Sequence, residues 1–180
     1  HVGGVEARLH RLFQSLAQRA AVDLAALDEL DIVLHHNEVD IIELMFNIIH
    51  QSPKALFDEV KKQGILLMIK VPLDSGWLTG KYTKATKHTG IRSRWTDDVI
   101  DIRLSIVDKI KSILGKDNIT QDSLRFILAH DAVTAVIPGV RNETQLLSNV
   151  GAQEEEMDSK TKQRLEELYD EFIKHQYTPW

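Results

Sequence analysis

The fold is decided by residues 65–82, Ile65-Leu-Leu-Met-Ile-Lys-Val-Pro-Leu-Asp-Ser-Gly-Trp-Leu-Thr-Gly-Lys-Tyr82. The apolar run at its start has glycine before it and proline after it and is too short for a helical stripe, which predicts a strand buried on both faces. Gly76 and Gly80 permit unusual backbone angles in the loop that follows, so backbone N–H groups can point outward together. Further donors in this loop are Ser75, Thr79 and Lys81. The stretch therefore predicts a phosphate-binding loop, with an ordinary glycine-containing turn as the alternative.

Outside this stretch the hydrophobic pattern alternates between strands and helices. The strands that it predicts, besides 65–71, are residues 39–46 and 132–137. The helices that it predicts are residues 4–20, 27–34, 53–63, 96–114, a helix from about 120, 142–150 with Asn142 as its cap, and 158–174. Such alternation with right-handed crossovers gives a parallel sheet, so the fold class is α/β. Three convincing strands are too few for an eight-stranded barrel of about 250 residues, which predicts a partial (β/α)8 TIM barrel.

Composition excludes several function classes. With 180 residues, the chain fits one domain with a sizeable core. The net charge of −5, from 22 basic and 27 acidic residues without a basic block, gives no surface for nucleic acid or an anionic membrane. There is no cysteine, no apolar run as long as a membrane span and no histidine spacing typical of a metal site. We expect a cytoplasmic protein without a metal.

Two motifs resemble those of the aldo-keto reductase family. Residues 72–82, Pro-Leu-Asp-Ser-Gly-Trp-Leu-Thr-Gly-Lys-Tyr, resemble the segment after the family's seventh strand, which wraps the cofactor pyrophosphate. Residues 136–149, Val-Ile-Pro-Gly-Val-Arg-Asn-Glu-Thr-Gln-Leu-Leu-Ser-Asn, resemble the motif after its eighth strand, which holds the 2′-phosphate and adenine. The resemblance covers about residues 27–176, and residues 21–30 resemble a degraded fifth strand and turn. It implies a divergent N-terminal helical segment, 1–26, followed by a C-terminal half-barrel, 27–180.

The resemblance implies NADP(H) as the cofactor, because Arg141 is placed to pair with a 2′-phosphate; a solvated surface arginine is the alternative. The cofactor-binding residues that it implies are Glu43, Lys70, Pro72, Leu73, Ser75, Gly76, Lys81, Arg92, Arg94, Gly139, Arg141, Gln145 and Asn149. Lys70 stands where many members have an aromatic residue, so it neutralises Glu43 or a phosphate, or the nicotinamide pocket is altered. Arg92 and Arg94 either close over the pyrophosphate or belong to a mobile polar loop.

The resemblance also implies transfer of a hydride from NADPH to an aldehyde or ketone, assisted by a Tyr, a Lys, an Asp and a His at the ends of the second to fourth strands. No tyrosine precedes Tyr82 and no lysine precedes Lys54, so none of the four is assigned here. Two hypotheses follow. The chain is the cofactor-binding C-terminal portion of a reductase, a fragment whose N-terminal half is missing. Alternatively, it is a non-catalytic half-barrel remnant or assembly module, which self-associates through its open sheet edges.

Overall fold

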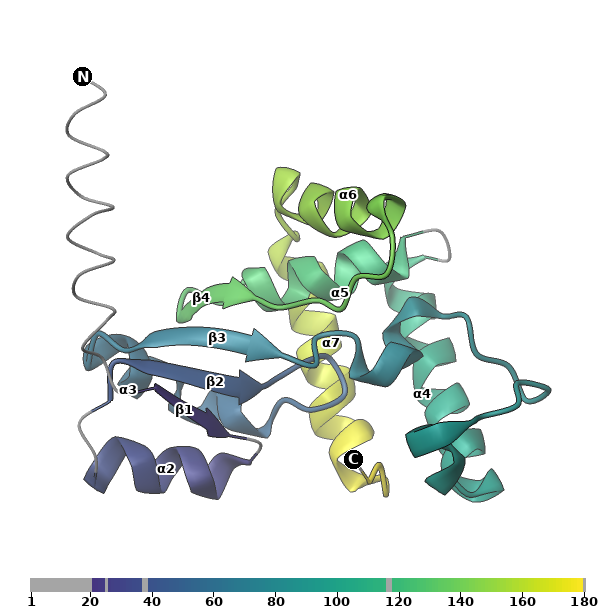
Figure 1. The fold of residues 1–180 in the computed structure, drawn as a ribbon, viewed down its shortest axis with the longest axis horizontal. Coiled ribbons are helices and arrows are strands. Elements are labelled where there is room, and N and C mark those ends of the chain that lie inside the picture. Colours follow the sequence, from purple (N-terminus) through teal and green to yellow (C-terminus); the bar gives the residue numbers. More distant parts are fainter. Residues whose placement is uncertain (1–20, 25, 37–38, 116–117, 180) are drawn as a thin grey trace.

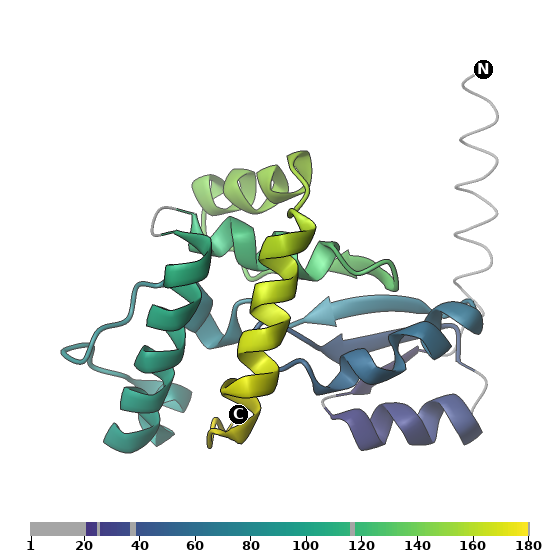
Figure 2. The same cartoon turned by 180° about the vertical axis from the view of Figure 1, so that it is seen from behind.

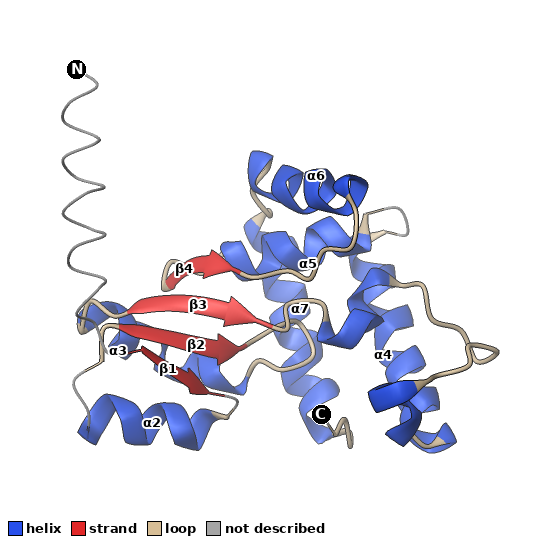
Figure 3. Ribbon diagram, in the orientation of Figure 1, coloured by secondary structure: helices blue, strands red, loops and turns tan. Residues whose placement is uncertain are grey.

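A four-stranded parallel sheet forms the centre of the computed structural model, which describes residues 21–24, 26–36, 39–115 and 118–179 (Figure 1). The strands are β1 (Ala21–Leu24), β2 (Ile41–Met45), β3 (Leu66–Lys70) and β4 (Val133–Val136). They pair in the order β1-β2-β3-β4, and each is parallel to its neighbour. Since parallel neighbours require a crossover, helical segments separate the strands along the chain (Figure 3).

The α-helices are α2 (Leu27–His36), α3 (Phe57–Lys62), α4 (Asp97–Leu114), α5 (Ile119–Leu128), α6 (Glu143–Gly151) and α7 (Ser159–Glu171). The 3-10 helices are η1 (Ser52–Leu56), η2 (Asp74–Thr79), η3 (Gly90–Arg94), η4 (Ala152–Glu154) and η5 (Ile173–His175). Figure 2 shows α3 and α7 on the side of the sheet that is turned away in Figure 1. Within the described part of the chain, no helix is both long and apolar enough to cross a membrane.

The elements agree with the predicted pattern except at the start of the sheet. The predicted strands and the helices from residue 27 onward are present, with ends shifted by a few residues, and the first half of the predicted helix 53–63 is the 3-10 helix η1. The sequence predicted three convincing strands, whereas the structure has a fourth, β1, which pairs with β2. This strand lies at the start of residues 21–30, the stretch that resembled a degraded strand and turn. The sheet therefore begins six residues before the predicted half-barrel boundary at 27. The predicted helix 4–20 lies outside the described residues.

The two faces of the sheet differ in burial. On β3, Leu67 and Ile69 are fully buried beneath the helices, while Leu66, Met68 and Lys70 on the opposite face are half-buried. This alternation follows the two-residue period of a strand. It corrects the prediction that this strand is buried on both faces: no helix of the described chain covers the second face, which a closed barrel would turn toward its interior.

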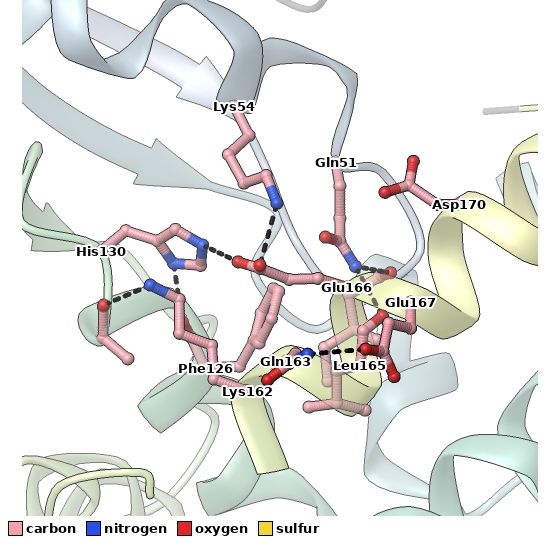
Figure 4. Close-up of polar contacts among 12 residues, drawn as sticks. Gln51, Lys54, Phe126, His130, Lys162, Gln163, Leu165, Glu166, Glu167 and Asp170 are labelled. Atoms are coloured by element: carbon pink, nitrogen blue, oxygen red, sulfur yellow. Dashed lines mark hydrogen bonds and ion pairs between the residues drawn. The ribbon is translucent and has the colours of Figure 1, made fainter. Parts of the chain in front are cut away.

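A polar cluster around the buried His130 links the end of α5 to α7 (Figure 4). His130 packs edge-on against the rings of Phe46, Phe57 and Phe126, with ring centroids 5.0 to 5.8 Å apart. Its Nδ1 lies 2.8 Å from the carbonyl oxygen of Phe126, and its Nε2 lies 3.2 Å from Oε1 of Glu166. Burial lowers the pKa of His130, and the nearby charge of Lys162 lowers it further. The cluster thus holds a neutral imidazole between α5 and α7.

The carboxyl ends of β3 and β4 lie next to each other. The two strands pair directly, and the amide of Ile137 donates to the carbonyl oxygen of Ile69 at 2.8 Å, which continues the pairing to the end of both strands. The loop after β3 and the segment from β4 to α6 therefore meet at one edge of the sheet. Open α/β sheets bind their ligands at this edge.

Candidate functional site

A cavity of about 700 Å³ opens at the carboxyl ends of β3 and β4. Its walls come from the loop after β3, from η3, from the segment between β4 and α6, and from α6, with Thr120 of α5 between them. Ten of the thirteen predicted cofactor-binding residues line it: Pro72, Leu73, Ser75, Gly76, Lys81, Arg92, Gly139, Arg141, Gln145 and Asn149. The structure thus brings residues from both sequence motifs to one hollow, with Ser75 of the first motif and Arg141 of the second on the same cavity.

The other three predicted residues, Glu43, Lys70 and Arg94, do not line this cavity. Lys70 forms an ion pair with Asp23 across the half-buried face of the sheet, and Asp23 is aligned with Glu43 in the register of β1 and β2. Arg94 is exposed on η3. The ion-pair partner of Lys70 in this structure is thus Asp23 and not Glu43. The sequence offered no sign of Asp23, because β1 was not among the convincing strands.

Three cations face the cavity. Lys81, Arg92 and Arg141 all belong to its lining. Partial burial lowers the pKa of Lys81, and the positive charges of Arg92 and Arg141 lower it further. Like charges gathered in one hollow repel one another, and an anion between them relieves this repulsion. The site is therefore chemically suited to a phosphate-bearing ligand.

The N-terminus of α6 adds to this positive potential. Asn142 caps the helix as predicted, because its Oδ1 accepts from the amide of Gln145 at 2.9 Å. Gln145 in turn accepts from the amide of Arg141 through Oε1, also at 2.9 Å, which fixes the segment that carries the arginine. Thr144 and Gln145 of the first turn line the cavity, where the helix dipole favours negative charge.

Asn149 presents a donor without a partner. Its Nδ2 is buried and makes no hydrogen bond within the described chain, although buried polar atoms are usually paired. It lies one turn beyond Gln145 on the cavity wall, so an acceptor on a bound ligand would satisfy it. Together with the three cations and the apolar side chains of Val71, Ile137 and Val140, this donor set fits a nucleotide that carries phosphates. Among the described residues, no group of acidic and histidine side chains is placed to hold a metal ion.

The loop after β3 has an unusual backbone. Val71, Asp74 and Ser75 have φ angles of 53°, 44° and 57°, in a region that costs a non-glycine residue about 1 to 3 kcal/mol. Gly76 has a φ of +98°, which favours glycine, and a Cβ there would lie 3.0 Å from the Tyr82 hydroxyl, closer than ordinary van der Waals contact. The backbone amide of Gly76 donates within the loop, to the carbonyl oxygen of Leu73 at 2.8 Å. That amide does not point outward as expected, so side chains and α6 supply the donors identified here.

Sequence reasoning missed the residues that support this loop. Arg103 of α4 is buried and forms an ion pair with the buried Asp74. A signal for it existed, because Arg103 stands at helical spacing among apolar residues that form the buried stripe of α4, namely Val99, Ile106, Val107 and Ile110. A charged residue within such a stripe indicates a buried partner.

Comparison with known proteins identifies the fold. Residues 19–170 match the model of the Aldo/keto reductase family. Similar solved structures include aldo-keto reductase AKR11C1 from Bacillus halodurans, holo form (17% identity, TM-score 0.63, covering 86% of this chain and 52% of that chain). Another is glycerol dehydrogenase AKR11B4 from Gluconobacter oxydans (18% identity, TM-score 0.68, covering 96% of this chain and 55% of that chain).

The four-stranded parallel sheet is thus part of a (β/α)8 barrel, as predicted. The chain spans about half the length of these structural neighbours. No curated protein sequence matches it.

Proposed function

We propose that this chain, which belongs to the aldo/keto reductase family, is the cofactor-binding portion of an NADP(H)-dependent oxidoreductase that reduces an aldehyde or ketone. The observation that carries the proposal is the convergence of Lys81, Arg92 and Arg141 on one cavity at the ends of β3 and β4. Such a set suits a nucleotide with three phosphate groups, because hydrogen bonds from charged donors to phosphate are among the strongest in proteins.

Each group of residues has a separate task in this proposal. Arg141, next to the start of α6, pairs with the 2′-phosphate, while Lys81 and Arg92 face the pyrophosphate. Gln145 and Asn149 bind the adenosine, for which the unpartnered Nδ2 of Asn149 is available. The bound cofactor supplies the hydride. The residues of this chain bind and orient it.

We assign no proton donor for the proposed reduction to the described chain. A general acid must lie within hydrogen-bond reach of the carbonyl oxygen. Tyr82, the first tyrosine of the sequence, donates to the carbonyl oxygen of Ser75 at 3.0 Å, within the phosphate loop. We therefore expect cofactor binding without turnover from this chain alone, and carbonyl reduction when the remaining strands of the family fold are supplied.

A titration with NADPH, followed by its fluorescence, tests the proposal. Micromolar binding of NADPH, with NADH at least about tenfold weaker, supports an NADP(H) site, because the third phosphate adds a charge-assisted contact. Competition by 2′,5′-ADP, which carries the 2′-phosphate without the nicotinamide, supports the assigned position of the adenosine half. Absence of NADPH binding at millimolar cofactor overturns the proposal.

A second candidate is assembly of half-barrels, which the open edges and faces of the sheet favour. Within the described chain, β1 and β4 each pair with one strand only, and unpaired edges invite association. Apolar side chains near β4 and on α6 are exposed, namely Ile137, Val140, Leu146, Leu147 and Val150. Sedimentation without nucleotide distinguishes the candidates. A stable dimer supports assembly, and a monomer throughout the micromolar range contradicts it.

A further inference from the structure

The wall of the cavity formed by residues 71–76 is strained. Val71, Asp74 and Ser75 are the non-glycine residues of the described chain with positive φ, and all three fall in this short segment. A β-branched residue such as Val71 rarely adopts this conformation. Strained backbone persists where the surrounding contacts determine it, and it gathers at binding sites. The contacts that hold this segment therefore shape the cavity wall.

The first contacts come from the turn after β2. Asn47, which is fully buried, donates from Nδ2 to the carbonyl oxygen of Val71 at 3.0 Å. Its Oδ1 accepts from the amides of Ile49 and His50 at 2.8 and 3.1 Å, which fixes the turn. His50 then faces Asp74, with Nε2 3.5 Å from Oδ1. One turn thus contacts two of the three strained residues, Val71 and Asp74.

The second set of contacts comes from α4. The guanidinium of Arg103 donates through Nη1 to Oδ2 of Asp74 and through Nη2 to the carbonyl oxygen of Pro179, the latter at 2.9 Å. The same group lies 5.7 Å from the ring centroid of Trp77 and 5.6 Å from that of Trp95.

Asp74 remains charged in this setting. Burial on its own would raise its pKa, but the imidazole of His50, 3.5 Å away, and the charge of Arg103 outweigh burial and hold the pKa below its ordinary value. An ionised Asp74 is consequently fixed from both sides.

We propose that Asn47, His50 and Arg103 are positioning residues, which hold residues 71–76 in the conformation that forms the cavity wall. None of the three lines the cavity. This inference deepens the proposed nucleotide function and rests on it. If the cavity wall adopts the binding conformation in only a fraction of the molecules, the apparent affinity for the nucleotide is the intrinsic affinity multiplied by that fraction. Replacing one of these positioning residues should therefore weaken nucleotide binding, although no group that contacts the nucleotide is removed.

His50 offers the sharpest test, because its side chain is partly exposed, at 17%, and tolerates replacement better than the fully buried Asn47 and Arg103. His50→Leu removes the group that faces Asp74, whereas His50→Gln retains an N–H donor on a side chain of similar reach. Val60→Ala serves as the matched control, because it truncates a fully buried side chain of α3, which does not line the cavity.

Two readouts are measured on all four proteins: NADPH affinity by fluorescence, and amide hydrogen exchange of the peptide that covers residues 71–79. We expect His50→Leu to weaken NADPH binding by about tenfold and to accelerate exchange in this peptide selectively. We expect His50→Gln to stay within about twofold of the parent chain in affinity. Val60→Ala should lower stability with unchanged affinity.

The outcomes separate this inference from the proposed function. If His50→Leu binds NADPH as tightly as Val60→Ala does, or if exchange in residues 71–79 is unchanged, the positioning role is overturned. If the parent chain binds no NADPH, the proposed function fails, and the exchange comparison decides the positioning role alone. Faster exchange in residues 71–79 of His50→Leu, absent from His50→Gln and Val60→Ala, then supports it.

Discussion

If the proposed function holds, Arg141→Ala should remove the preference of the site for NADPH over NADH. Arg141 is exposed at the mouth of the cavity, and its own amide is fixed by Gln145. A charge-assisted hydrogen bond contributes about 1.5 to 3 kcal/mol. Since the group is exposed, the lower end of that range applies. We therefore expect NADPH to bind about tenfold more weakly to the variant.

NADH provides the internal control for this prediction, because it lacks the 2′-phosphate. Its affinity should change by less than about twofold, and the difference between the cofactors should shrink as salt screens the exposed pair. Arg164→Ala, an exposed arginine of α7 that is not part of the cavity lining, should leave both affinities unchanged. An equal loss of NADPH and NADH binding in Arg141→Ala, or no loss of either, would refute the assignment of Arg141 to the 2′-phosphate.

The same substitution has a readout that needs no ligand. The positive charge of Arg141 contributes, after burial and Arg92, to the lowered pKa of Lys81. Removing that charge should raise the pKa of Lys81 toward its ordinary value. Titration of the lysine side chain by NMR measures this shift, and an unchanged pKa would mean that Arg141 and Lys81 are not neighbours in solution.

Three further predictions concern stability. Gly80→Ala should cost about 1 to 2 kcal/mol in urea unfolding, because Gly80 has φ of +68° and a Cβ there would lie 2.8 Å from Cε of Lys111; an unaltered midpoint would contradict this geometry. Arg103→Met should cost about 3 to 5 kcal/mol by removing the buried guanidinium that pairs with Asp74, and adding Asp74→Leu should recover part of the loss; a double variant no more stable than the single would show that the pair is not coupled. His130 gives a pH dependence: burial lowers its pKa in the folded state, so its contribution to stability is present above the unfolded pKa of about 6.5 and is lost as the pH falls below that value. His130→Gln should therefore flatten the fall of unfolding free energy between about pH 7 and pH 5.5, and an unchanged slope would contradict the buried neutral imidazole.

The sequence indicated most of the residues that line the cavity, but not the buried residues that support its wall. Residues 72–82 and 136–149 could be aligned with a family because short loops that bind phosphate need particular glycines and donors at fixed spacing. β1 was not among the convincing strands because Ala21-Val-Asp-Leu24 is short and contains a charge. Its pairing with β2, rather than its own hydrophobic pattern, makes it a strand.

Other features depend on the folded chain and leave little trace in the sequence. The ion pair of Lys70 joins β3 to Asp23 on β1, two strands away, and requires the sheet order. The positive φ of Val71 runs against the preference of its own residue type, and the residue is held by hydrogen bonds to its carbonyl oxygen from Asn47 and from the amide of Asp74. Arg103 is the exception, because a charge within the apolar stripe of α4 could have indicated a buried partner.

If the cavity at the ends of β3 and β4 binds the phosphates of a nucleotide, a crystal structure of this chain grown with NADP⁺ should show them there. We expect phosphate density in contact with Lys81, Arg92 and Arg141, and adenine beside Asn149. Nucleotide bound elsewhere, or a cavity without nucleotide at saturating NADP⁺, would contradict it.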